Sequence, residues 1–107
     1  MNTKIQLIRD LMLSVVPEVY HYTAASKADK YIAWAEDMEA DSQAGDNKKI
    51  CQSVQGTVDY FTKQEFDPNV DKIQQAFDGA EIPWRLNSVQ YEEETQYIHY
   101  EWVWEIG

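Results

Sequence analysis

The chain has 107 residues, of which 19 are acidic and 9 basic, so its formal net charge is -10 at pH 7. This length fits one domain, because single-core domains commonly have about 100 to 150 residues. The charge argues against specific nucleic-acid binding, which depends on Lys and Arg side chains that neutralise phosphates. The only adjacent basic residues are Lys48 and Lys49. We therefore expect a single domain over residues 1–107 that does not bind nucleic acid specifically.

The chain contains one cysteine, Cys51, so it cannot form an internal disulfide. Disulfides are typical of small secreted domains, and a single cysteine favours an intracellular protein. The apolar N-terminal stretch is interrupted by Arg9 and Asp10 and falls short of the roughly 20 apolar residues that span a membrane. The sequence therefore predicts a soluble cytoplasmic protein with no membrane partner.

The first helix is expected over Thr3–Val16. Its apolar residues recur at spacings of three and four, which is typical of one helical stripe: Ile5, Ile8, Leu11, Met12 and Val15. Pro17 should end the helix, because its ring cannot continue the hydrogen-bond pattern. A short extended segment over 19–22 and a small polar loop over 23–30 follow.

Two strands are expected in the middle of the chain. Residues 31–38 alternate bulky with small side chains, which favours a strand, and the polar residues 39–47 form an exposed connection. The longest strand candidate covers 49–62, where Gly56 indicates a bulge or a bend. Its expected buried face carries Ile50, Val54, Val58 and Tyr60.

The second helix has the clearest end signals in the chain. Asp67 is a suitable N-cap, Pro68 suits the first helical position, and Gly79 stands where a left-handed residue is expected at the end of the helix. Its apolar stripe consists of Val70, Ile73, Phe77 and Ala80. The pattern predicts a short amphipathic helix between the long strand and the C-terminal strands.

The C-terminal third is expected to form a hairpin of two strands, 84–91 and 97–106, around the acidic turn 92–96. In the first strand Leu86 and Val89 fall on opposite faces, and a bulge near Asn87-Ser88 would bring them together. The second strand alternates cleanly. Its bulky face, which we expect to pack against the helices, carries Ile98, Tyr100, Trp102, Trp104 and Ile106.

These elements follow the order α-β-β-β-α-β-β and lack the regular alternation of a βαβ fold. We therefore predict an α+β domain in which two helices pack on one face of an antiparallel β-sheet.

No chemistry is predicted from the motifs. Neither His21 nor His99 lies in a nucleophile motif, and Cys51 stands in the middle of an expected strand. The pair His99-x-Glu101 offers two metal ligands on one strand face, which is too few to close a site. The four glycines are scattered, so there is no phosphate loop. We expect no catalytic, cofactor-binding or metal-binding residue, and a protein that is not an enzyme.

The aromatic content favours assembly. Seven tyrosines, four tryptophans and three phenylalanines exceed what so small a core must hold. The last strand leaves a second set of side chains on the face away from the helices. That set is a candidate subunit interface: Tyr97, His99, Glu101 and Val103.

The order of these segments resembles that of the tail-terminator and tail-completion (head-tail joining) proteins of long-tailed bacteriophages. In its detailed residue sequence the chain resembles small prophage proteins of Gram-positive bacteria, found among the head and tail morphogenesis genes. The stretches that carry the resemblance are L-I-R-D-L-M, V-Y-H-Y, K-Y-I-A-W-A-E-D, V-Q-G-T-V-D-Y-F-T-K, F-D-P-N-V-D-K-I-Q-Q-A-F, W-R-L-N-S-V-Q-Y-E and Y-I-H-Y-E-W-V-W-E. They cover nearly the whole chain. No catalytic motif belongs to this resemblance.

The resemblance implies a structural virion protein. Its subunits would form a ring, commonly a hexamer, that caps the tail tube, stops its growth and meets the head connector. The partners implied are other copies of the chain, the tail tube protein and the head connector proteins. The protein would occur in the host cytoplasm during assembly and then in the tail or neck of the virion.

The acidic residues allow two hypotheses. They could line a channel that DNA passes without sticking, or face a partner; the residues in question are Glu36, Asp37, Glu39, Asp41, Glu92, Glu93 and Glu94. Alternatively, the chain could be a small DNA-mimic inhibitor of a nucleic-acid-binding enzyme. A mimic should array its acids at about phosphate spacing, whereas these acids cluster in two places.

Overall fold

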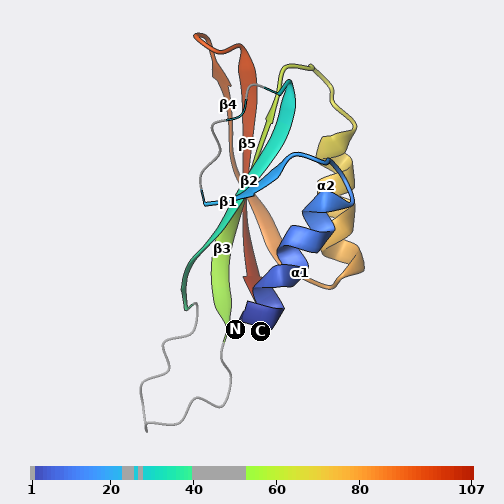
Figure 1. Ribbon diagram of the computed structural model, residues 1–107, viewed down its shortest axis with the longest axis vertical. Helices are drawn as coiled ribbons and strands as arrows, with labels where there is room; N and C mark the ends of the chain where they lie inside the picture. The colour runs from blue at the N-terminus through green and yellow to red at the C-terminus, as the bar shows by residue number, and fades with distance from the viewer. Residues whose placement is uncertain (1, 23–25, 27, 40–52) are drawn as a thin grey trace, which may run out of the picture.

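A computed structural model of the protein describes residues 2–22, 26, 28–39 and 53–107. Its helices and strands are α1 (Asn2–Leu13), β1 (Val19–His21), β2 (Lys30–Glu39), β3 (Val54–Thr62), α2 (Asn69–Gly79), β4 (Trp84–Glu92) and β5 (Tyr97–Ile106). The two helices lie together on one side of a single sheet (Figure 1). The protein is therefore an α+β domain over the part of the chain described.

The five strands are ordered β1-β2-β3-β5-β4 in the sheet, so β5 lies between β3 and β4. The expectation of an antiparallel sheet is wrong at one edge, because β1 pairs with β2 in parallel. Backbone bonds extend this pair beyond β1, from Ile32 N to Glu18 O at 2.9 Å and from Tyr22 N to Trp34 O at 2.7 Å. The stretch between the two strands carries no tight-turn signal of the kind that joins antiparallel neighbours.

The core lies between the helices and one face of the sheet. The expected stripes are confirmed, since Ile5, Ile8 and Met12 of α1 and Ile73 and Phe77 of α2 are all buried. The expected bulky face of β5 is confirmed too, with its first two residues half-buried and its last three buried. Full burial of a large apolar side chain contributes roughly 1.5–3 kcal/mol, so this layer supplies most of the stability.

The end of each helix differs by two or three residues from the sequence expectation. Helix α1 ends at Leu13 rather than at Val16, because Val15 N bonds to Met12 O in a tighter turn. In α2, Gly79 is still helical and its φ is not positive, so the expectation of a left-handed glycine is wrong. Glu81 takes the left-handed conformation instead, with φ 58°.

The end of α2 forms a Schellman motif around Glu81. Ile82 N bonds to Phe77 O at 2.9 Å and Glu81 N bonds to Asp78 O at 3.0 Å. Ile82 and Phe77 are both part of the buried core. Burial of Ile82 thus selects Glu81 as the left-handed residue at the helix end, although Gly79 stands two residues before Glu81.

Two bulges adjust the faces of the sheet. The expected bulge near Asn87-Ser88 is confirmed, because the pairing of β4 with β5 skips from Leu86 to Ser88. It places Leu86 and Val89 on the same face, opposite Trp102 and Tyr100 of β5. A second bulge, which the sequence did not indicate, lies in β2 between Glu36 and Met38.

The bulge in β2 lies beside Gly56 of β3, which pairs with Glu36 and with Trp104 of β5. A Cβ atom at position 56 would overlap the Trp104 ring and the carbonyl oxygen of Ala35. Gly56 therefore lets an aromatic ring lie directly on the backbone of β3. Of the expected strand over 49–62, residues 49–52 lie outside the described residues, and the alternation of Val54, Val58 and Tyr60 is confirmed.

Gly56→Ala should lower the free energy of unfolding by about 2 to 3 kcal/mol, because the new methyl group displaces Trp104 or the neighbouring backbone. Urea unfolding followed by tryptophan fluorescence measures the change. Gly79→Ala is the matched control: nothing lies within 4 Å of its added Cβ, and a helical Gly→Ala change should raise stability by about 0.5 kcal/mol. Equal effects of the two variants would contradict the packing described.

Candidate functional site

The face of the sheet away from the helices, here called the distal face, carries the side chains of β5 that alternate with its buried ones. The expected interface residues Tyr97, His99, Glu101 and Val103 all lie on it, because Trp102 and Trp104 between them point into the core. Their neighbours on β3 are Thr57, Asp59 and Phe61. The structure thus brings the four residues to one face.

An aromatic ladder crosses the distal face at the end of the sheet near the β4–β5 turn. Tyr31 of β2 stacks on Phe61 of β3 with ring centroids 4.6 Å apart, and Phe61 stacks on His99 of β5 at 4.2 Å. Tyr97 meets the rings of Tyr31 and Phe61 edge-on, at 5.4 Å and 6.0 Å. Such contacts contribute about 0.5–1.5 kcal/mol each beyond burial, so they add to the packing of this part of the face.

Tyr97 is buried within this ladder and is not a surface residue. Its hydroxyl donates to the carbonyl oxygen of Ala28 at 2.5 Å, and Lys63 Nζ lies 5.0 Å from the centre of its ring. Only 7% of Tyr97 is exposed. It holds the segment before β2 against the sheet, while the other three predicted interface residues are partly exposed.

His99 lies on the distal face with carboxylates close to both of its ring nitrogens. Its Nε2 lies 2.8 Å from Asp59 Oδ1, and its Nδ1 lies 3.6 Å from Glu92 Oε2. The hydrogen bond with Asp59 raises the pKa of His99, and the charges of Asp59, Glu92 and Glu101 add to this, while burial opposes it. His99 therefore keeps its proton to a higher pH than a free histidine does.

The two remaining candidates have simpler surroundings. Glu101 accepts a hydrogen bond from Asn87 Nδ2 at 2.9 Å, so the bulge residue of β4 orients it. Val103 is half-buried beside Thr57 and Arg85. Together with His99 they give the distal face a mixed surface of charge and small apolar groups, which suits a protein contact better than a reaction.

A second histidine cluster lies at the β1 edge, on the helix side of the sheet. His21 stacks on Trp34 at 3.9 Å, and its Nε2 lies 2.7 Å from Glu36 Oε1. Tyr22 donates its hydroxyl hydrogen to Glu36 Oε2 at 2.7 Å. Burial alone would raise the pKa of Glu36, but the bonds from His21 and Tyr22 lower it. Sequence reasoning missed this cluster, because it depends on the parallel pairing of β1 with β2.

The acidic candidates are spread along the molecule. Glu36 and Asp37 lie in β2, and burial together with the charges of Glu101, Asp59 and Glu36 raises the pKa of Asp37. Glu39 ends β2, and Asp41 lies outside the described residues. The other acidic group ends β4 or forms the exposed β4–β5 turn: Glu92, Glu93 and Glu94.

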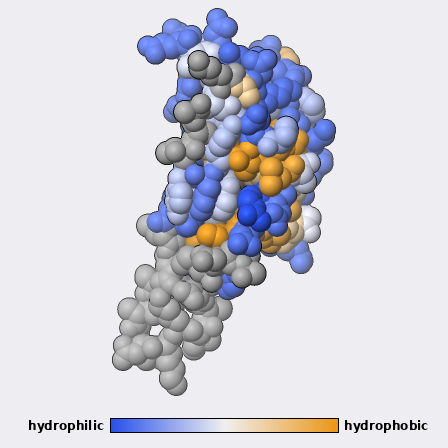
Figure 2. Space-filling view, viewed as in Figure 1, coloured by the Kyte–Doolittle hydropathy of each residue, from blue (hydrophilic) through white to orange (hydrophobic). Residues whose placement is uncertain are grey.

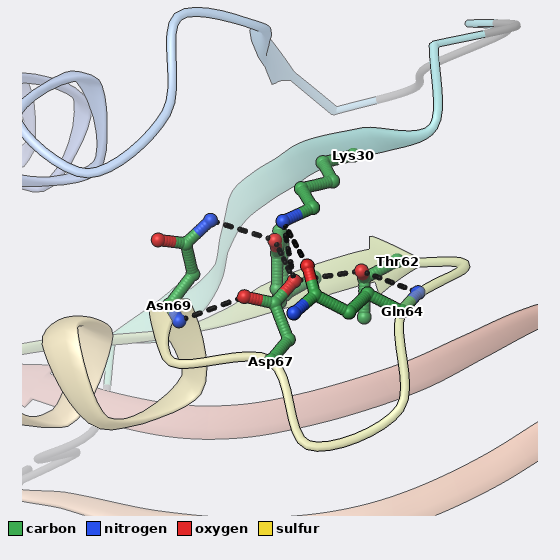
Figure 3. Close-up of polar contacts among 6 residues, drawn as sticks. Lys30, Thr62, Gln64, Asp67 and Asn69 are labelled. Atoms are coloured by element: carbon green, nitrogen blue, oxygen red, sulfur yellow. Dashed lines mark hydrogen bonds and ion pairs between the residues drawn. The ribbon is translucent and has the colours of Figure 1, made fainter.

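Among the described residues, Asp67, just before α2, is the most completely bonded carboxylate, and sequence reasoning assigned it only as a cap (Figure 3). Its Oδ2 accepts hydrogen bonds from Tyr60 and Thr62, each at 2.7 Å. Its Oδ1 accepts the backbone N–H of Asn69 at 2.8 Å, which is the bond expected of an N-cap. Lys30 Nζ lies 3.4 Å away. The expected cap is confirmed, and it also ties α2 to β2 and β3.

Asp67 is only 4% exposed, yet it is held as a carboxylate. Burial alone would raise the pKa of Asp67, but the bonds from Tyr60, Asn69 and Thr62 and the charge of Lys30 lower it. Burial and Asp67 also raise the pKa of the Tyr60 hydroxyl, so Tyr60 stays a donor. Every oxygen of Asp67 is occupied by groups of the chain, which makes the network structural rather than a ligand site.

Asp67→Ala should lower the free energy of unfolding by about 2 to 4 kcal/mol, because it strands the buried hydroxyls of Tyr60 and Thr62 and removes the cap. Since the folded pKa of Asp67 is lowered, its contribution is present above the ordinary pKa of 3.8 and is lost as pH falls through the folded value. Urea unfolding at several pH values measures both effects. Asp71→Ala, an exposed acid in the first turn of α2, is the control and should change stability by less than about 0.5 kcal/mol.

Asp59→Asn should lower the pKa of His99 toward its ordinary value of 6.5, because it removes the main cause of the shift. NMR titration of the His99 ring protons measures this directly. In the native chain, the raised pKa means that the stabilising contribution is complete below pH about 6.5 and is lost as pH rises through the folded value. Glu105→Gln, on the same strand but exposed, should leave the titration unchanged.

Chemistry and comparison add no further assignment. Among the described residues, no group of three or more His, Cys, Asp or Glu side chains could hold a metal ion. No helix in the described part of the chain is long and apolar enough to cross a membrane. Comparison with known proteins finds no matching family model and no similar curated protein. A proposal about function therefore rests on the residue pattern and on the geometry of the two sheet faces.

Proposed function

We propose that this chain is a structural morphogenesis protein of a long-tailed bacteriophage or prophage. It is a ring-forming tail terminator or head-tail joining protein that caps the tail tube and connects it to the head. Its partners are further copies of itself, commonly six in the ring, together with the tail tube protein and the head connector proteins. It assembles in the host cytoplasm and remains in the tail or neck of the virion.

The observation that carries this proposal is the division of the sheet into two faces. Both helices cover one face, while the distal face keeps His99, Glu101 and Val103 partly exposed beside the aromatic ladder. A closed ring needs two different patches on each subunit. The distal face supplies one such patch, and the stretches that resemble the phage proteins cover nearly the whole chain.

The charge distribution supports passage of DNA rather than binding of it. Figure 2 shows hydrophilic residues over much of the coloured surface, around an apolar patch near its middle, and the formal net charge is -10. An acidic channel wall repels phosphate, so DNA would not adhere to it. The proposal places the acidic residues of β2 and of the β4–β5 turn on the channel or on a partner surface.

The same distribution does not favour a DNA mimic. Glu36 is bonded by His21 and Tyr22, and the β4–β5 turn lies at the opposite end of the sheet from the end of β2 (Figure 1). A mimic needs a continuous row of free acids at about phosphate spacing.

Deletion of the gene tests the function at the level of the particle. We expect tails of uncontrolled length, or tails not joined to heads, when lysates are examined by electron microscopy. A plasmid copy of the gene should restore normal particles. Normal virions from the deletion strain would refute the proposal.

A surface variant tests the role of the distal face. Val103→Arg should abolish rescue of the deletion, because it places a bulky charge on the proposed contact surface. Phe66→Arg is the control, since Phe66 is 88% exposed and lies in the loop between β3 and α2, outside the strands that form the distal face. Circular dichroism should show that both variants fold. Full rescue by a folded Val103→Arg protein would exclude the distal face as the assembly surface.

A further inference from the structure

Strand β4 is the last strand of the sheet, and no described strand pairs with its outer edge. An unpaired edge presents a row of free backbone N–H and C=O groups to any chain that can align with it. Natural proteins commonly protect such an edge with charges, proline or a very short strand. Strand β4 runs without proline from Trp84 to Glu92 and has a single arginine in its interior.

Beyond Trp84, which packs against the core, the helix-side face of β4 is apolar and exposed. Leu86, Val89 and Tyr91 are 43%, 50% and 60% exposed, and the bulge at Asn87 aligns them on one face. The cross-strand neighbours of these residues on β5 are Trp102, Tyr100 and Ile98, so the apolar surface continues directly from the core. An apolar row beside a free edge favours a partner that adds a strand.

We propose that β4 pairs antiparallel with β4 of a second copy of this chain, about a two-fold axis at Val89, and so joins two sheets into one. With Asn87 bulged out of the ladder, each residue of the strand meets a partner from the same face. The pairs are Val89 with Val89, Ser88 with Gln90, Leu86 with Tyr91, and Arg85 with Glu92.

Charge complementarity selects this register. Arg85 and Glu92 share the distal face, as their pairing with Val103 and Tyr97 of β5 shows. The two-fold axis places Arg85 of each copy opposite Glu92 of the other. Two-fold registers centred on Ser88 or Gln90 also keep the faces together. Both registers separate Arg85 from Glu92, and the one centred on Gln90 also shortens the paired stretch, so they are less favourable.

Strand β4 of a second copy is a better partner for this edge than β1, the strand at the other edge of the sheet. Strand β1 has only three residues and would offer a short ladder to β4. Pairing of β4 with itself is isologous, so it closes at two copies and leaves no free edge at the contact. The inference does not depend on the proposed function, because the distal faces of both copies stay open.

Analytical ultracentrifugation of the full chain tests the pairing. The contact is small, so we expect a reversible dimer whose share grows between about 10 µM and about 1 mM. Val89→Lys places two like charges on the two-fold axis and should weaken the dimer at least tenfold. Leu13→Lys, at a site 46% exposed on α1, should leave it unchanged. A native chain that is monomeric at every concentration, or a Val89→Lys protein that dimerises normally, would overturn the proposal.

A charge exchange tests the register. Arg85→Glu and Glu92→Arg should each weaken self-association at least tenfold, because each places like charges opposite one another. An equimolar mixture of the two variants restores opposite charges at both ends of the ladder and should form a heterodimer. Native mass spectrometry distinguishes it from the two parents. A mixture that associates no better than its components would overturn the register.

Discussion

The alternation of side chains along β5 is the constraint on which the rest of the structure depends. Trp102, Trp104 and Ile106 are buried under the helices, and every residue between them is forced to the distal face. The Trp104 ring lies on the backbone of β3, which leaves no room for a side chain at Gly56. One strand thereby fixes where the core lies, how closely its neighbour approaches and which residues are left for other proteins.

A second constraint ties α2 to this sheet. The buried carboxylate of Asp67 accepts bonds from two hydroxyls of β3 and from the first turn of α2, and it stays ionised because these donors and Lys30 outweigh its burial. The network sets the start of α2, and the contact of Ile82 with the core sets its end. With both ends fixed, the helix covers its part of one face and leaves Leu86, Val89 and Tyr91 of β4 exposed.

The sequence predicted the features that depend on local pattern. The apolar stripes, the alternation of β5, the cap at Asp67 and the bulge at Asn87-Ser88 follow from residue spacing alone, and the structure has them. The features it missed depend on contacts between distant segments. Glu81, not Gly79, is left-handed because Ile82 is buried. The parallel pairing of β1, and with it the contact of His21 with Glu36, leaves no trace in local periodicity.

The candidate interface shows the same division. Strand alternation placed Tyr97, His99, Glu101 and Val103 on one face. It could not show that Tyr97 is buried and bonded to Ala28, or that Asp59 bonds to His99.

The most direct test of the central claim is electron cryomicroscopy of the purified protein mixed with polymerised tail tubes. A closed ring at one end of each tube, with distal faces in contact between subunits or with the tube, is the predicted result. Tubes with bare ends at saturating protein would contradict it.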